Sequence, residues 1–131
     1  MKIDLKNEPF NLIGATDFVI EDWTIEPDQS EPPMWQAPLH RHHGCDEAWY
    51  VLEGSLGFLV DSQTVDAGPG DLVYVKKGQS HTFWNSSKTP TRFLIFMTAK
   101  TQDLISAIHA SSDRSPESLK KLFASFEAEL L

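Results

Sequence analysis

Two short segments of the chain bring together histidine and carboxylate residues, which are side chains that often bind transition metals in proteins. The first segment, PLHRHHGCDEAWYVLEG, contains His40, His42 and Glu47, and the second, GDLVYVKKGQSHTFWN, contains His81. If His40 and His42 lie on an extended strand, their side chains project from the same face, because they are two residues apart. Three neutral imidazoles and one carboxylate suit a divalent transition metal and leave coordination positions open for other molecules.

Turn residues allow these positions to meet. Gly44 lies between the two histidines and Glu47, so a returning strand can place the carboxylate beside the imidazoles. Gly78 precedes His81, which then begins a further strand and supplies a third imidazole. We therefore expect one metal site, formed by His40, His42, Glu47 and His81.

Three other reactive side chains are not assigned to this site. His43 is adjacent to His42, so in a regular strand it points to the opposite face. Cys45 has no separate base to activate its thiol, and we expect it to be a bystander. His109 falls in a predicted helix, and we expect it on the helix surface.

The elements that must position the site are short runs rich in aromatic and β-branched residues, separated by Gly, Pro, Asn, Asp and Ser. Gly54 separates two of these runs by a single residue and predicts a tight hairpin in which it adopts a positive φ. Many short strands without intervening helices predict an all-β antiparallel sandwich or barrel. The predicted strands cover residues 18–25, 34–40, 47–53, 55–61, 71–75, 81–85 and 92–97.

The last third of the chain changes to a helical period. Apolar residues at three- and four-residue spacing predict an amphipathic helix over 115–131, with Ser115 as its N-cap. A shorter helix is predicted over 102–110, capped by Thr101. Residues 93–97 are apolar at every position, so we expect the helices to cover the outer face of that last strand or to pack on a partner subunit.

In both metal-ligand segments the spacing resembles that of the cupin superfamily. The family's first motif is a glycine, five residues, His-x-His, three or four residues, Glu, six residues and Gly, which here reads His40, His42, Glu47 and Gly54. Its second motif is Gly-Asp, four residues, Pro-x-Gly, two residues, His, three residues and Asn, which here reads Gly70, Asp71, Gly78, His81 and Asn85. Met34 stands where the leading glycine would be, and Lys76 replaces the proline, so both departures affect backbone shape and not the ligands.

The resemblance implies a jelly-roll (cupin) β-barrel with a metal inside one end. Residues 1–131 then form a single cupin domain, with a barrel core at about 17–97 and a C-terminal helical segment at about 101–131. It also implies one divalent transition metal per chain, of which iron, manganese, zinc and nickel all fit this ligand set. Among small cupins, the chain resembles the quercetin dioxygenase-like proteins.

We expect the substrate pocket to be lined by residues that lie on the same inward strand faces as the candidate ligands. Counting by twos from Glu47 gives Trp49 and Val51, and counting from His81 gives Phe83. Arg92 is the cation of the late strands, and we expect it at a solvated edge rather than facing an anionic substrate. Weaker pocket candidates, whose strand parity is uncertain, are Trp35, Phe58, Tyr74 and Phe96.

Composition narrows the class of function. The chain has 131 residues with a formal net charge of -8, which repels phosphate backbones and anionic lipids, so we expect no nucleic-acid or membrane partner. The single cysteine cannot form an intrachain disulfide, and charges interrupt the apolar residues near the N-terminus. These features predict a cytoplasmic protein.

Three classes of function follow from this site. The first is a metal-dependent enzyme acting on a small molecule, with dioxygenase-like oxidoreductase chemistry as the leading reaction. A non-redox isomerase or decarboxylase needs the same four ligands, and the sequence assigns no catalytic residue beyond them. The second is a non-catalytic module that binds a metal or small ligand. The third, a structural zinc site, is disfavoured because such sites are tetrahedral and rich in cysteine.

A homodimer is predicted from the exposed edges of an open jelly roll and from the all-apolar run at 93–97 in so small a chain. Sedimentation at micromolar concentration should then give about twice the chain mass, as a symmetric dimer requires. A clean monomer would contradict the prediction.

Overall fold

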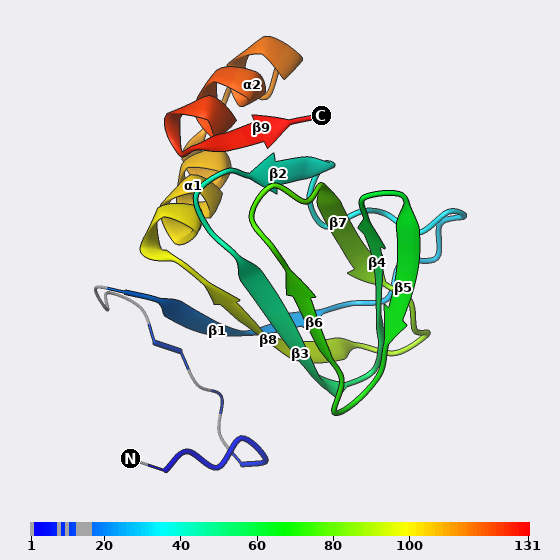
Figure 1. Ribbon diagram of the computed structural model, residues 1–131. Helices are drawn as coiled ribbons and strands as arrows, with labels where there is room; N and C mark the ends of the chain where they lie inside the picture. Colours follow the sequence, from blue (N-terminus) through cyan, green and yellow to red (C-terminus); the bar gives the residue numbers. More distant parts are fainter. Residues whose placement is uncertain (1, 8, 10, 13–16) are drawn as a thin grey trace.

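Two antiparallel sheets face each other in the computed structural model, which describes residues 2–7, 9, 11–12 and 17–131 (Figure 1). The first sheet has the order β1-β8-β3-β6, with bounds Val19–Ile25, Thr91–Met97, Glu47–Glu53 and Leu72–Val75. The second has the order β5-β4-β7-β2-β9, with bounds Gln63–Ala67, Leu56–Val60, His81–Asn85, His40–His42 and Ala128–Leu130. Helices α1 (Ala99–Ala110) and α2 (Pro116–Ser125) lie at the end of the barrel near β2. This jelly roll with C-terminal helices confirms the predicted fold class.

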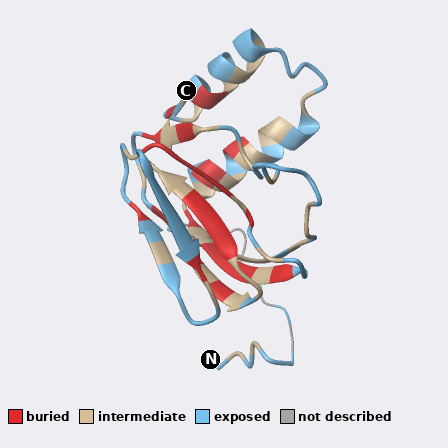
Figure 2. Ribbon diagram, turned by 90° about the vertical axis from the view of Figure 1, so that its right-hand side faces the viewer, coloured by how far each residue is buried: buried red, intermediate tan, exposed pale blue. Residues whose placement is uncertain are grey.

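The core lies between the sheets because each long strand buries alternate side chains. Along β3, Glu47, Trp49 and Val51 are buried while the residues between them are only half-buried. Figure 2 shows buried residues along the long strands, with further buried positions on both helices. Trp49, Phe58 and Phe83 form a connected group of rings with centroids 5.3 to 5.9 Å apart. Each such aromatic pair contributes about 0.5–1.5 kcal/mol beyond the area that it buries.

One predicted strand requires correction, and one strand of the structure was not predicted. The predicted strand at 34–40 is absent over residues 34–39, and β2 begins only at His40. Pro38 has no backbone N–H for a ladder, and the preceding backbone is held by a turn in which the Asp28 carboxylate accepts a hydrogen bond from the Met34 N–H at 2.5 Å. Sequence analysis also missed β5, because its residues are exposed except for Ala67 and lack the apolar alternation of a strand.

Both predicted helices differ in extent from those of the structure. The first begins at Ala99 with Thr98 as its N-cap, three residues before the predicted cap. The second ends at Ser125, Glu127 adopts a φ of 57°, and the chain then returns as β9. Phe126 and Leu130 fit a helical period, and they nevertheless reach the same apolar cluster from a turn and a strand.

Of the two placements expected for the helices, the one on the outer face of the last strand is wrong. They cover the end of the barrel at β2 and β9 rather than the outer face of the last strand (Figure 1). In the part of the chain that the structure describes, neither helix is long and apolar enough to cross a membrane.

The hairpin glycine yields a stability prediction. Gly54 has a φ of 80°, and a Cβ there would lie 2.8 Å from the Cα of the buried Thr91. Gly70 has a similar φ of 89° but nothing within 4 Å of such a Cβ. We expect Gly70→Ala to lower the free energy of unfolding by about 1–2 kcal/mol through backbone strain alone. Gly54→Ala should cost at least about 1 kcal/mol more because overpacking is added. Urea unfolding measures both, and equal losses would contradict the predicted clash.

Candidate metal centre

Four buried side chains from both sheets converge at one end of the barrel. His40 and His42 project inward from β2, and His81 lies opposite His40 in the β2–β7 ladder. Glu47 comes from β3 in the facing sheet. One ligand atom of each residue lies within 4.8 Å of those of the others. The structure therefore brings together the residues that the sequence predicted as metal ligands.

Backbone carbonyls orient two of the imidazoles. The Nδ1 of His40 lies 2.7 Å from the carbonyl oxygen of Pro38, and the Nδ1 of His81 lies 3.1 Å from that of Gln79. Because a carbonyl oxygen only accepts, each Nδ1 carries the proton and donates it. In the neutral rings, the Nε2 lone pairs then point toward the centre of the group. Such hydrogen bonds fix the tautomer of metal-binding histidines.

The centre of the group brings the Nε2 atoms of three imidazoles and one carboxylate oxygen close together. The His81 Nε2 lies 2.8 Å from the Glu47 Oε2, and the His42 Nε2 lies 3.2 Å from the same oxygen. The Nε2 atoms of His40 and His42 are 3.2 Å apart. A lone pair that faces a carboxylate at these distances is repulsive unless a proton or a cation lies between them. The four residues therefore fit a divalent metal ion.

Burial sets the protonation of the group. Desolvation and the neighbouring His81 lower the pKa of His40 to about 4, so this ring is neutral at pH 7. Burial by itself raises the pKa of Glu47, but the contacts with His42 and His81 outweigh burial and lower it. Glu47 is therefore an ionised carboxylate inside the barrel. A buried charge of this kind requires a compensating cation.

A cavity of about 300 Å³ adjoins the four residues and lies between the barrel and the C-terminal helices. Its wall is mostly apolar and, apart from Glu47, contains no carboxylate, lysine or arginine among the described residues. The lining residues other than the four candidate ligands are Trp23, Gln36, Ala37, Pro38, Trp49, Phe83, Ile95, Thr101, Leu104, Ile105, Ile108, His109 and Phe123.

The predicted pocket residues divide between cavity and core. Trp49 and Phe83 line the cavity, and the Trp49 ring lies 5.7 Å from that of His81. Val51 is completely buried in the barrel core and does not line the cavity, because it lies two residues beyond Trp49 along β3 and so further from Glu47. Of the weaker candidates, Phe58 is in the core, Phe96 is half-buried outside the cavity, and Trp35 and Tyr74 are exposed.

Residues not assigned to the site also have definite places. His43 is exposed, and its Nε2 lies 3.2 Å from a carboxylate oxygen of Glu129. The Cys45 Sγ contacts the Thr101 Oγ1 at 3.1 Å. Arg92 donates to both carboxylate oxygens of Asp22, at 3.0 and 2.6 Å, so it is paired within the protein.

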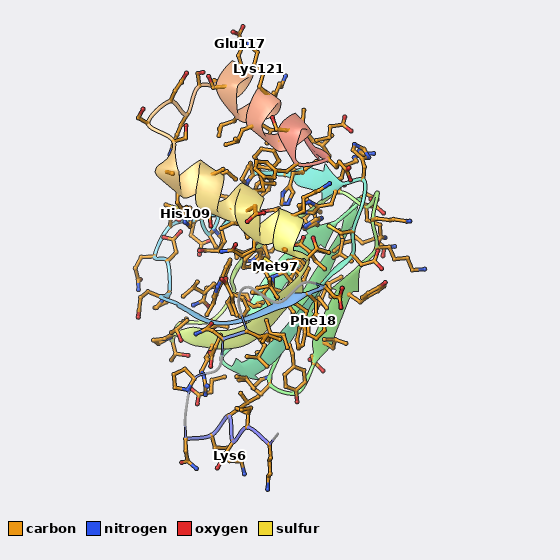
Figure 3. The ribbon with its side chains drawn as sticks, turned by 90° about the vertical axis from the view of Figure 1, so that its left-hand side faces the viewer. Lys6, Phe18, Met97, His109, Glu117 and Lys121 are labelled. Carbon is orange, nitrogen blue, oxygen red and sulfur yellow. The ribbon has the colours of Figure 1, made fainter. Side chains whose placement is uncertain are left out.

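Sequence analysis missed the helical wall of the cavity. His109 is exposed and lies near the C-terminal end of α1 (Figure 3), yet it also lines the cavity. Its four-residue spacing from Ile105 places both on one helix face and was the available signal. Phe123 of α2 also lines the cavity, with its ring 5.4 Å from that of His40. No local pattern showed that α2 returns to the ligand strand.

An antiparallel jelly roll with three histidines and one glutamate buried at one end defines a β-barrel protein with a candidate metal centre. The family model described as "Cupin domain" matches residues 22–97, and the chain belongs to this family.

Curated relatives match only part of the chain. The oxalate-binding protein of Thermotoga maritima is 33% identical over 63 residues, which are 48% of this chain and 52% of that protein. Germin-like protein 1 of Brassica napus is 30% identical over 77 residues, which are 55% of this chain and 37% of that protein. The chain thus spans about half or less of the length of these relatives.

Solved structures share the fold. The polyketide cyclase RemF from Streptomyces resistomycificus is 29% identical, with a TM-score of 0.55 and coverage of 68% of this chain and 62% of that chain. A putative sugar phosphate isomerase from Acidithiobacillus ferrooxidans is 23% identical, with a TM-score of 0.57 and coverage of 69% and 58%.

The proposed ligand set predicts which histidine substitutions reduce the metal content of the protein and which do not. His81→Ala removes one donor and leaves the Glu47 carboxylate without its nearest imidazole, so the purified variant should lose most of its metal. His43→Ala and His109→Ala change histidines outside the group and should retain it. Elemental analysis of protein prepared without a metal-affinity tag measures the content. Equal loss in all three variants would refute the ligand assignment.

Proposed function

We propose that this chain is a metal-dependent enzyme that acts on a small, ring-bearing molecule, with dioxygenase-like oxidation as the leading reaction. The observation that carries the proposal is the apolar cavity that opens directly onto the four buried ligands. Four protein donors would leave a six-coordinate ion two ligands short, so a bound metal would be open to small molecules that enter the cavity. A metal kept for stability alone gains nothing from open positions.

The cavity wall indicates the chemistry of the substrate. Trp23, Trp49, Phe83 and Phe123 supply aromatic surface on which a ring can stack. Because the described wall has no lysine or arginine, a phosphate group would lack a counter-charge there. An enediol, phenol or related group that chelates the metal fits this wall better than a sugar phosphate does. The isomerase likeness, at 23% identity, concerns the fold alone.

The residues of the chain have separate roles in this proposal. His40, His42, Glu47 and His81 would hold the metal, which when redox-active supplies dioxygen activation. The aromatic wall orients the ring of the substrate and excludes bulk water, which strengthens electrostatic interactions in the site. His109 is the one titratable side chain of the described wall outside the ligand group, so its imidazole is the candidate for exchanging a proton with the substrate.

A non-redox reaction is the second candidate. The likeness to a polyketide cyclase at 29% identity favours it, because an uncharged aromatic cavity also suits an enolisable carbonyl compound. The likeness to an oxalate-binding protein favours a third candidate, a binding module without turnover.

Metal substitution separates these candidates. The metal-free chain is loaded with iron(II), manganese(II), nickel(II) or zinc(II) and incubated with catechols, enediols and 1,3-diketones under ¹⁸O₂. A dioxygenase transfers both oxygen atoms to its substrate, so we expect oxygen uptake and doubly labelled product with a redox-active metal and none with zinc. If the zinc-loaded chain turned over substrate as fast as the chain loaded with a redox-active metal, and no oxygen were consumed, the reaction would be non-redox. Binding without turnover for every metal would establish the binding module.

The aromatic wall yields a prediction on ligand binding. In the cobalt(II)-loaded chain, Trp49→Leu should weaken binding of catechol about 5- to 10-fold, since one aromatic contact contributes about 1 kcal/mol. Azide binds the metal without needing a ring surface, so its affinity should change less. Titration of the cobalt absorption spectrum measures both affinities. Trp35→Leu is the matched control, because Trp35 is exposed and lies outside the cavity. Equal effects of the two variants would contradict the stacking role.

A further inference from the structure

The strand that carries two of the four candidate ligands has little support of its own. β2 contains only three residues, and its ladder with β7 consists of the single pair His40 and His81. One further bond on that side joins the Gly78 N–H to the His42 carbonyl at 2.7 Å. Its other neighbour is β9, which pairs with all three residues of β2. The C-terminal strand therefore supplies most of the backbone pairing that holds β2.

Hydrogen bonds from the C-terminal segment bracket both ligands of β2. The Leu131 N–H donates to the Leu39 carbonyl at 3.0 Å, and the His43 N–H donates to the Glu127 carbonyl at 2.8 Å. Bonded and non-bonded pairs alternate in an antiparallel ladder, so Arg41 and Glu129 form the bonded pair between them. It also follows that the N–H of Leu130 points away from β2.

Side chains couple the same segment to the ligands. The Phe123 ring of α2 lies 5.4 Å from the His40 imidazole at an interplanar angle of 67°. Phe123 belongs to an apolar cluster with Leu104 and Ala128, which is separate from the barrel core. An element with its own small core can open locally while the rest of the protein stays folded.

We propose that α2 and β9 form a positioning element for the metal centre, so that docking of β9 on β2 and metal binding stabilise each other. With β9 docked, the backbone on both sides of His40 and His42 is fixed, and their Nε2 atoms face Glu47 and His81. With β9 released, two of four donors stand on a strand held from one side only. Coupling between two binding equilibria is reciprocal, so metal must strengthen the docking of β9 by the same factor. The coupling does not depend on the reaction proposed above.

Proline substitution tests the ladder. Glu129→Pro removes the bonded N–H in the middle of β9, whereas Leu130→Pro places the same ring where the N–H points away from β2. Glu129→Ala controls for the loss of the Glu129 carboxylate, which lies near Arg41 and His43. Zinc affinity is measured by competition with a chelator, and thermal unfolding of each metal-free variant shows whether the barrel remains folded.

We expect Glu129→Pro to lower zinc affinity by about 10- to 100-fold, the range seen when residues that orient metal ligands are changed. Glu129→Ala should stay within about threefold of the unchanged chain, as for substitutions that break no such feature. Leu130→Pro keeps the ladder with β2 but loses the contact of Leu130 with the apolar cluster, so it should lower zinc affinity less than Glu129→Pro does. In the cobalt(II)-loaded form, only Glu129→Pro should alter the absorption spectrum. Unchanged affinity in Glu129→Pro, or equal loss in both proline variants, would overturn the proposal.

Hydrogen exchange on the unchanged chain tests reciprocity even if a variant fails to fold. Residues 127–131 contain none of the candidate ligands, so slower exchange of their amides on adding zinc reports the coupling itself. β5 pairs with β4 and not with a strand that carries a candidate ligand, so it is the internal reference. We expect zinc to slow exchange at 127–131 and to leave β5 nearly unchanged. Zinc binding with unaltered exchange at 127–131 would refute the coupling.

Discussion

The centre of this barrel depends on compensating one buried negative charge. Glu47 is ionised and buried, and two neighbouring imidazoles have their Nδ1 protons committed to backbone carbonyls. The Nε2 atoms of three imidazoles and one Glu47 oxygen lie together, with contacts of 2.8 to 3.2 Å, and the buried carboxylate needs a compensating positive charge. The strands at this end of the barrel hold the four side chains in place. A divalent metal would supply the positive charge and take these atoms as ligands.

That constraint explains why both sheets and the C-terminal segment contribute. The inward alternation of β3 buries Glu47 next to Trp49, so the charged ligand and the aromatic wall come from consecutive inward positions. The β2–β7 ladder sets His40 opposite His81. β2 cannot be long, because Pro38 precedes it and a turn follows it. A strand this short needs support from elsewhere in the chain, and β9 supplies it.

The parts that sequence could predict rest on local rules. Period-two alternation identified most strands, Gly54 marked the hairpin, and motif spacing brought the four ligands together. Parity assigned Trp49 and Phe83 to the inward face, which they occupy in the cavity wall. The same parity assigned Val51, which is inward but too far along its strand to reach the cavity. The alternation of side chains tells which face of the sheet a residue is on, whereas its position relative to the cavity depends on the tertiary fold.

The parts that sequence could not predict depend on partners distant in the chain. Leu130 fits a helical period after Phe126, but the left-handed turn at Glu127 sends it onto a strand whose partner lies about ninety residues earlier. A three-residue strand has too little local preference to form alone, so its conformation follows from what it pairs with. β2 and β9 are both of this kind: β9 pairs with β2, and β2 pairs with both β9 and β7. The metal centre therefore rests in part on a pairing that neither segment encodes by itself, and docking of the C-terminal segment completes the support of the strand that carries His40 and His42.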